Sequence, residues 1–393
     1  MFKKLPFILL ILIATTLIIN PFLPVEVKQY LYAISLSVKS LILLILPFVI
    51  FSLLFSTISS LSRGATNIIG LILLALCCSN FISTFLSHYV GAWIYNFDLT
   101  LITPKEASGL QPAFIFELPK LIANDKAMFA GIISALVLGR FKPNLTKLIA
   151  TKLDWFASKI LNSFAILVTL FVLGFLCKMQ NDGIIQLIIR DYSKIFLVVI
   201  SAQIGYLLFT YAALNLFNPR KTFNSIKNIL PAALAGFTTM SSAAVMPLTI
   251  MGAEQNAKNK KLSKSVIPLT VNIHLVGDCI AIPIFAYAVL KSFGMPAPEL
   301  MQYIIFVMYF VIAKFSVAAI PGGGIIVMLP ILEGYLGFNG EMLSLITALY
   351  ILFDPVITSA NVLGNGMFAK LIDNLMGVSF KGVKASGALP QES

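Results

Sequence analysis

The sequence predicts an all-α integral membrane protein, and its composition and its apolar runs support that prediction. Of the 393 residues, 59% are hydrophobic and 11% are charged, whereas a soluble domain carries about 25% charged residues. The apolar residues gather in long runs, and a bilayer core of roughly 30 Å needs about 20 apolar residues to be crossed as a helix. A soluble enzyme is therefore excluded, and the sequence contains no catalytic constellation.

The apolar runs follow one another along most of the chain, at residues 5–23, 30–61, 66–97, 127–140, 153–177, 184–217, 229–253, 266–290, 301–333 and 342–368. Most are long enough to span a bilayer, and we expect about eight transmembrane helices. The first run is long for the apolar region of a signal peptide, and no A-x-A-like site follows it. It is interpreted as a retained first membrane helix.

Two of the runs are interrupted near their middle. One break carries Ser241, Ser242 and Pro247, and the other spans residues 318–324 with a proline and three glycines. Such residues break a helix, and broken backbone at membrane depth is tolerated only beside protein or a water-filled cavity. Each segment is therefore predicted to be a re-entrant helical hairpin. The serines can ease a turn or bind a carboxylate, and the glycines can form a plain turn or a gate.

The net charge of +12 is carried by short loops between the apolar runs, which argues against nucleic-acid binding. Basic residues gather at positions 3–4, 140–152, 220–227, 258–264 and 381–384. With about eight spanning helices and two hairpins, all of these loops fall on one side, and the positive-inside rule makes that side cytosolic. We therefore expect a multi-pass protein of the cell's inner (plasma) membrane with both termini in the cytosol.

The two interrupted runs belong to a weak internal repeat. Each precedes a helix with a polar patch, at residues 272–278 after the first and 354–365 after the second. Two broken segments in corresponding places, with opposite entry sides, are typical of inverted-repeat transporters and mark their binding site. The pattern predicts a secondary transporter whose site lies among these four segments.

Four ionisable residues, His274, Asp278, Lys314 and Asp354, lie inside the apolar runs, where each costs roughly 2.5–3.5 kcal/mol. His274 and Asp278 are four residues apart and share one helix face. Lys314 is open to two interpretations, a fixed internal salt bridge with Asp278 or Asp354, or a group beside a solute. His274 is equally open, as a structural histidine or a proton carrier.

Asp354 begins a polar stripe on one face of the last helix, which continues with Thr358, Asn361 and Asn365. Tyr350 lies one turn before Asp354 on the same face. A polar stripe in an otherwise apolar helix lines a cavity or a partner helix rather than lipid. We interpret Asp354 as a solute-binding residue.

At these motifs the chain resembles the dicarboxylate/amino acid:cation symporters, the glutamate transporter family, most clearly from about 219 to 375. The resemblance rests on residues 37–53, on the serine-rich segment 241–247, on the segment 320–324, and on residues 354–365, which are similar to the pattern D-x-x-R-T-x-x-N-V-x-G-D. It implies a glutamate-transporter-like fold with inverted repeats, a homotrimer in the lipid bilayer, and elevator-type alternating access.

The resemblance also implies a division of the chain. Residues 1–218 are expected to be mostly scaffold and trimerisation helices with part of the transport domain, and residues 219–378 to be the core transport domain. Within that core, hairpin 1 is expected at 219–258, a helix at 262–292, hairpin 2 at 299–338 and the last helix at 341–378. Residues 379–393 are expected to form a cytosolic tail.

Carried over by position, the resemblance places the substrate site between the hairpin tips and the last helix. Asp354 would bind the amino group and Asn361 the main carboxylate, with help from Ser242 and Gly324, while Thr358 would lie beside the side chain. The residues expected to bind substrate are Ser241, Ser242, Gly322, Gly324, Asp354, Ile357, Thr358 and Asn361. Those expected in coupling and gating are His274, Gly277, Asp278, Lys314, Pro321, Gly323 and Asn365.

Three departures from the family pattern change the expected ligands. The arginine that would pair a side-chain carboxylate is Ile357, which cannot offer a bidentate fork, so a neutral amino acid is favoured over a dicarboxylate. The family's N-M-D-G-T motif reads His274 to Asp278 here, with Val276 in place of its acid, and the acid of the last helix is Asn365. The inherited sodium sites near Val276 and Asn365 are therefore degenerate, and no metal site is predicted.

These departures leave the coupling cation open between H⁺ and Na⁺, and no cofactor is expected. One hypothesis is that the Lys314 ammonium replaces a bound sodium ion, with Asp278 as its counter-charge. Another is that His274 and Asp278 form a proton path. The predicted function is transport of a small amino acid or dicarboxylate. The alternatives are an ion channel or leak pathway, and a transport-dead binding protein on the same scaffold.

Overall fold

The structure is a computed structural model that describes residues 15–16, 18–61, 66–96, 109–116, 118–119, 121–122, 124–181, 184–317 and 322–385. Every regular element within these ranges is a helix, which confirms the predicted all-α class. Most of the predicted first membrane helix, 5–23, lies outside the described residues.

Most of the helices follow one another with short connections, the stretch between α3 and α4 being the exception, and several helices are much longer than the average for globular proteins. They are η2 (Asn20–Phe22), α2 (Val25–Leu61), α3 (Thr66–Asn96), α4 (Asn124–Phe141), α5 (Pro143–Asn181), α6 (Ile184–Leu214), α7 (Pro219–Thr239), α8 (Met246–Asn256), α9 (Lys260–Thr270), α10 (Val276–Ser292), α11 (Leu300–Ala313), η3 (Lys314–Ser316), α12 (Gly323–Leu336) and α13 (Gly340–Ala385).

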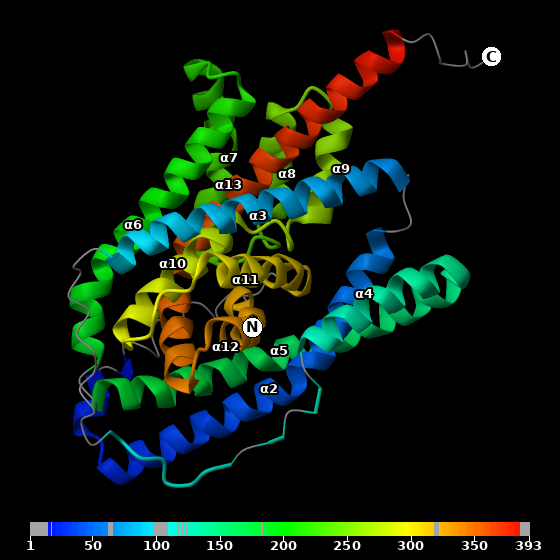
Figure 1. Ribbon diagram of the computed structural model, residues 1–393. Helices are drawn as coiled ribbons and strands as arrows, with labels where there is room; N and C mark the ends of the chain where they lie inside the picture. Colours follow the sequence, from blue (N-terminus) through cyan, green and yellow to red (C-terminus); the bar gives the residue numbers. More distant parts are fainter. Residues whose placement is uncertain are drawn as a thin grey trace.

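The helices gather into two groups (Figure 1). Helices α2, α4 and α5 pack on one another along one side of the molecule, while α3 and α6–α13 form the other group. The groups meet where α2 packs against η3 and α12, and where α5 packs against α6 and α13. Elements of both groups therefore pack against η3 and α12. The assignment of a scaffold and a transport domain to these groups stays a prediction.

Helix α10 is the centre of the second group. All of its residues from Val276 to Leu290 are buried, and α3, α6 and α13 pack around it. A helix that is apolar on every side belongs in the interior of a protein. Any polar residue on α10 must therefore find its partner inside the molecule, which places Asp278 in the core.

Helices α7 and α8 form an antiparallel hairpin. Met240 has a positive φ of 49° and ends α7, and Pro247 lies in the first turn of α8, a position where its missing N–H costs nothing. At the base, Asn228 Nδ2 donates to Asn256 Oδ1 at 2.9 Å, and Asn256 Nδ2 donates to the Ser225 carbonyl at 2.8 Å. The pair lies within the predicted hairpin 219–258.

Helices α11 and α12 form a second antiparallel hairpin, within the predicted range 299–338. Gln302 Nε2 donates to the Tyr335 carbonyl at 2.9 Å and ties the two ends at the base. Gly322, with a positive φ of 73°, precedes the first turn of α12, a conformation that glycine adopts without a Cβ clash. That both hairpins are re-entrant in a bilayer stays a prediction.

The helix expected at 262–292 is interrupted, since α9 ends at Thr270 and α10 begins at Val276. Asn80 Nδ2 of α3 donates to the Ile273 carbonyl at 2.9 Å within the break, so a side chain satisfies backbone that leaves the helix. The last helix is longer than the expected range 341–378. Helix α13 continues to Ala385 into the predicted tail, because no proline follows Pro355 in that segment.

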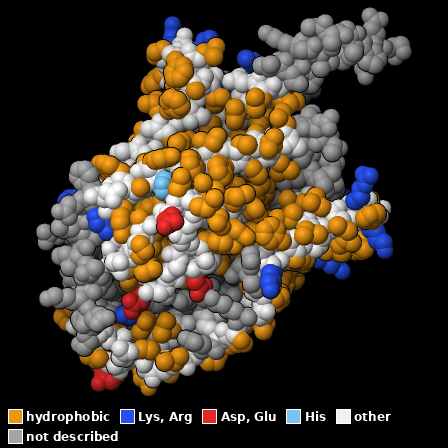
Figure 2. Space-filling view, viewed as in Figure 1, with side chains coloured by type: hydrophobic (Ala, Val, Ile, Leu, Met, Phe, Trp, Pro, Cys, Tyr) orange, Lys and Arg blue, Asp and Glu red, His pale blue; other side chains and the backbone are white. Residues whose placement is uncertain are grey.

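The outer surface is apolar in a way that suits a bilayer. Figure 2 shows hydrophobic side chains covering much of one face, with Lys and Arg side chains mostly near its ends. Leu74, Leu86 and Trp93 of α3 are among the exposed apolar residues. Among the described residues, three helices are long and apolar enough to cross a membrane, at Gly70–Asn96, Ser193–Leu214 and Gly340–Met376. The expected count of about eight spanning helices stays a prediction.

Asp373 generates a prediction for the stability of this fold. Its carboxylate accepts the N–H of Lys258 at 2.7 Å and of Asn259 at 2.9 Å, which fastens the α8–α9 connection to α13. We expect Asp373→Ala to lower the free energy of unfolding by about 3 kcal/mol, because two charge-assisted hydrogen bonds are lost. Unfolding of the detergent-purified protein measures this, with Asp154→Ala at an exposed α5 position as the matched control. Equal stabilities of the two variants would contradict the assignment.

Candidate functional site

The site lies where α10, η3, α12 and α13 meet, and a buried ion pair is at its centre. Lys314 Nζ lies 2.8 Å from Asp278 Oδ2, and the two side chains are 0% and 1% exposed. Lys314 also lies over the ring of Phe310, with 4.6 Å between its Nζ and the ring centroid. Of the two partners that the sequence left open for Lys314, the structure places Asp278 against it.

The other oxygen of Asp278 is held by α13. Tyr350 donates its hydroxyl to Asp278 Oδ1 at 3.1 Å, and Asn361 Nδ2 donates to the same oxygen at 3.0 Å. Together with the Lys314 ammonium, three donors thus satisfy the carboxylate. A buried carboxylate needs such a set, because an unpaired charge in the interior is very costly.

Asn361 also fixes the start of α10. Its Oδ1 accepts the N–H of Gly277 at 2.8 Å and the N–H of Asp278 at 3.4 Å, which satisfies first-turn donors of the helix. A Cβ on Gly277 would meet the carbonyl oxygen of Ile357, so glycine lets α10 and α13 approach closely. Both polar atoms of the Asn361 amide are therefore engaged within the protein.

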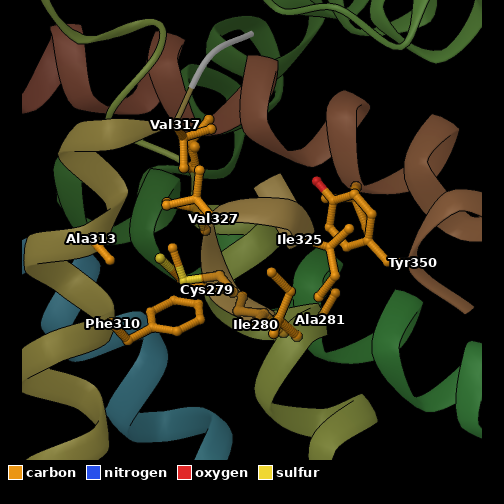
Figure 3. Packing of buried hydrophobic residues seen from close by; sticks show 14 of the residues in the cluster. Cys279, Ile280, Ala281, Phe310, Ala313, Val317, Ile325, Val327 and Tyr350 are labelled. Carbon is orange, nitrogen blue, oxygen red and sulfur yellow. The ribbon is translucent and has the colours of Figure 1, made fainter. Parts of the chain in front are cut away.

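Gly324 lies on the remaining side of the carboxylate. A Cβ at this position would overlap Asp278 Oδ2 and the Tyr350 hydroxyl. The first turn of α12 thus packs directly against the buried acid. Apolar residues close in sequence to Asp278, Lys314 and Gly324 belong to one buried cluster, and Figure 3 shows Cys279, Phe310 and Ile325 among them. Charges in such a dry setting interact far more strongly than they do in water.

Asp354 holds the tip of the second hairpin. Its Oδ2 accepts the N–H of Gly322 at 3.0 Å, and its Oδ1 accepts the Thr358 hydroxyl at 3.0 Å. The side chain is 4% exposed, and among the described residues no Lys or Arg forms an ion pair with it. Gly323 begins α12 directly after this contact. Pro321 lies outside the described residues.

The first hairpin reaches the same stretch of α13. Ser359 donates its hydroxyl to the Ala233 carbonyl at 2.7 Å, and Gly236 lies against Thr358 and Val362. In the turn between α7 and α8, Ser241 Oγ accepts the N–H of Ala244 at 3.3 Å, while Ser242 is buried. Both hairpins therefore converge on the polar stripe of α13.

His274 lies apart from the ion pair. Its Nε2 is 2.8 Å from the Ser79 hydroxyl, and its ring lies 4.4 Å from that of Phe368. No hydrogen bond or ion pair described for this part of the chain joins it to Asp278, so the proton path stays a hypothesis.

Three other expected positions are buried without a role in the ion pair. Val276 and Ile357 are fully buried and apolar. Asn365 is fully buried, and neither atom of its amide has a partner among the described residues.

Two contributors to the site were absent from the sequence prediction. Gln203 of α6 donates its Nε2 to the Gly277 carbonyl at 3.0 Å, and Ser79 of α3 contacts His274. The signal that could have found them is a polar side chain within an apolar run, the rule that selected Asp354.

The sequence is similar to a known protein family and to several curated proteins. A model of the sodium:dicarboxylate symporter family matches residues 5–375. The chain is 26% identical over 209 residues to excitatory amino acid transporter 1 of Ambystoma tigrinum, covering 52% of this chain and 37% of the relative. It is 24% identical over 185 residues to the proton/sodium-glutamate symport protein of Geobacillus stearothermophilus, covering 47% and 44%. The chain thus spans less than half the length of these curated relatives.

The close approach at Gly324 can be tested directly. We expect Gly324→Ala to lower the free energy of unfolding by about 1–3 kcal/mol, because the added methyl group overpacks the contact with Asp278 and Tyr350. Gly334→Ala is the matched control in the same helix, since a Cβ there meets nothing within 4 Å. Thermal unfolding of both variants measures the difference, and equal melting temperatures would be inconsistent with this packing.

Proposed function

The chain belongs to the sodium:dicarboxylate symporter family, and from that premise we propose that it is a secondary transporter of a small amino acid with an uncharged side chain. This is a family of membrane transporters rather than of enzymes. The observation that carries the proposal is the charge balance of the buried site, in which Asp278 is paired and Asp354 is not.

The charge balance favours a cationic occupant. The site holds two carboxylates, Asp278 and Asp354, and one ammonium, Lys314, which leaves one negative charge. Among the described residues, the groups that donate to Asp354 are the neutral donors of Gly322 and Thr358. An occupant that brings an ammonium group to Asp354 removes an unpaired buried charge, which is strongly favourable. The amino group of an amino acid has this chemistry.

The occupant's own carboxylate needs donors rather than a cation. The first N–H groups of α12, at Gly323 and Gly324, have no partner within their helix, and a helix N-terminus favours an anion. The hydroxyls of Ser241 and Ser242 at the tip of the first hairpin complete the proposed donor set. Asn361 is proposed to position Asp278 instead, since its Oδ1 accepts from Gly277 and its Nδ2 donates to Asp278.

A second carboxylate in the occupant's side chain would find no cation. Lys314 is engaged by Asp278, and position 357 holds a buried isoleucine. A carboxylate without a partner in a dry site is disfavoured by several kcal/mol. The proposed substrate is therefore a neutral amino acid rather than aspartate, glutamate or another dicarboxylate.

The proposed cycle uses the second hairpin as a gate. When the N–H of Gly322 leaves Asp354, the carboxylate becomes available to the substrate, and the glycines from Gly322 to Gly324 absorb the backbone change. We propose that both hairpins are re-entrant and that α7–α13 move as the mobile part of a homotrimer. The cycle is of the elevator type, driven by H⁺ or Na⁺.

Uptake into proteoliposomes tests the function. Labelled alanine, serine, aspartate and glutamate are offered in turn, with proton and sodium gradients imposed separately. We expect uptake of a neutral amino acid that Asp354→Asn abolishes and the exposed Asp154→Asn leaves unchanged, because only Asp354 pairs the substrate's ammonium. Ionic current without solute uptake would favour the channel, and the absence of both would favour a transport-dead binding protein.

Ile357→Arg tests the basis of substrate choice. A guanidinium at this position supplies the cation that a side-chain carboxylate requires. We expect the ratio of aspartate to alanine uptake to rise about tenfold, the equivalent of a charge-assisted hydrogen bond of roughly 1.5 kcal/mol. Ile357→Met is the matched control of similar volume and should leave the ratio as in the wild type. An unchanged ratio in a folded Ile357→Arg protein would refute the proposed role of this position.

A further inference from the structure

We propose that the Lys314 ammonium is the permanent counter-cation of Asp278, so that no sodium ion binds at this carboxylate. The inference deepens the proposed function, because it concerns the coupling ion of the same site. It departs from what the family's name implies, since that name couples transport to sodium. The argument rests on the donors around the carboxylate and on the place of Lys314 in the fold.

The groups around Asp278 are donors, whereas a sodium ion needs oxygen ligands. Lys314 Nζ contacts Oδ2 at 2.8 Å, and Asn361 Nδ2 and the Tyr350 hydroxyl contact Oδ1. Gly324 packs so closely against Oδ2 that a Cβ would overlap it. A sodium ion at Oδ2 would have to displace the ammonium, and the two cations would repel each other.

The surroundings offer little to compensate a second cation. Among the described residues there is no cluster of three or more acidic, histidine or cysteine side chains. Val276 of α10 is apolar and Asn365 of α13 is neutral, although both are fully buried near this centre. Asp354 supplies the nearest further carboxylate, and its oxygens bind Gly322 and Thr358. The residues present therefore do not fit a sodium ion at Asp278.

The position of Lys314 in the fold shows how an ammonium in place of sodium affects the second hairpin. Lys314 lies in η3, directly after α11 and before the tip of the second hairpin. Its bond to Asp278 ties that hairpin to α10, and Tyr350 and Asn361 extend the tie to α13. If an exchangeable sodium ion were bound at this carboxylate instead, closure of the hairpin would depend on the sodium concentration outside. A covalently attached ammonium keeps the tie at any sodium concentration.

The test measures ion binding rather than transport. The full-length protein is purified in detergent, and its melting temperature is compared in sodium chloride and in choline chloride at equal ionic strength. The variants are Lys314→Met, Lys314→Arg and the double variant Lys314→Met with Asp278→Asn. We expect sodium to raise the melting temperature of Lys314→Met by several degrees more than that of the wild type, because Asp278 then lacks its cation.

Two controls define the result. Lys314→Arg keeps a cation and should respond to sodium as the wild type does, and the double variant should lose the added response because its carboxylate is gone. A sodium response of the wild type as large as that of Lys314→Met would overturn the proposal, because sodium would then bind while the ammonium is in place. If Lys314→Met does not fold, Asp278→Asn keeps it testable, because a sodium response that the wild type shows and Asp278→Asn lacks would also overturn it.

This outcome is independent of the proposed function. A failed sodium test leaves the role of Asp354 untouched, since Gly322 and Thr358 hold that carboxylate whichever cation pairs Asp278. Conversely, a protein that transports nothing in proteoliposomes can still show the predicted gain of sodium binding in Lys314→Met. The melting temperatures therefore test the proposal about Lys314, and the uptake measurements test the proposed function separately.

Discussion

The buried ion pair between Lys314 and Asp278 is the interaction on which the rest of the site depends. Both side chains are almost fully enclosed, and an ionised group in such a place is tolerated only when a partner and hydrogen bonds compensate it. That requirement determines which residues surround the Asp278 carboxylate. Helix α13 supplies Tyr350 and Asn361, and α12 begins with glycines that let its first turn lie against the acid. One carboxylate thereby fixes the relative positions of α10, η3, α12 and α13.

The second carboxylate is held more weakly, and this asymmetry makes the proposed function possible. Asp354 has two neutral donors, one of them the N–H of Gly322 at a hairpin tip. A contact from a glycine that starts a helix can be exchanged for a ligand at small cost, whereas the contact of Lys314 with Asp278 cannot. In the proposed function, the contact of Lys314 with Asp278 is permanent and the contact of Gly322 with Asp354 is releasable, which is what a gate over a cationic ligand needs.

The sequence predicted much of this arrangement from the cost of polar groups in lipid. It predicted a break in each of the two interrupted runs and the polar face of α13 that begins at Asp354, and it offered a buried salt bridge as one of two interpretations of Lys314. It left the partner of Lys314 open, because spacing along a chain does not say which of two acids a third segment meets. The break before Val276 and the bond of Asn361 to Asp278 also depend on tertiary contacts. They escaped prediction for the same reason.

A double-mutant cycle on the unfolding free energy tests the central claim most directly, with Lys314→Met, Asp278→Asn and the pair together. If the ion pair organises the site, each single variant loses about 3–5 kcal/mol, because it leaves one buried charge uncompensated. The double variant then loses less than either single variant, since no buried charge remains unpaired. Losses that simply add would contradict the account, because they would mean that Lys314 and Asp278 stabilise the protein independently of each other.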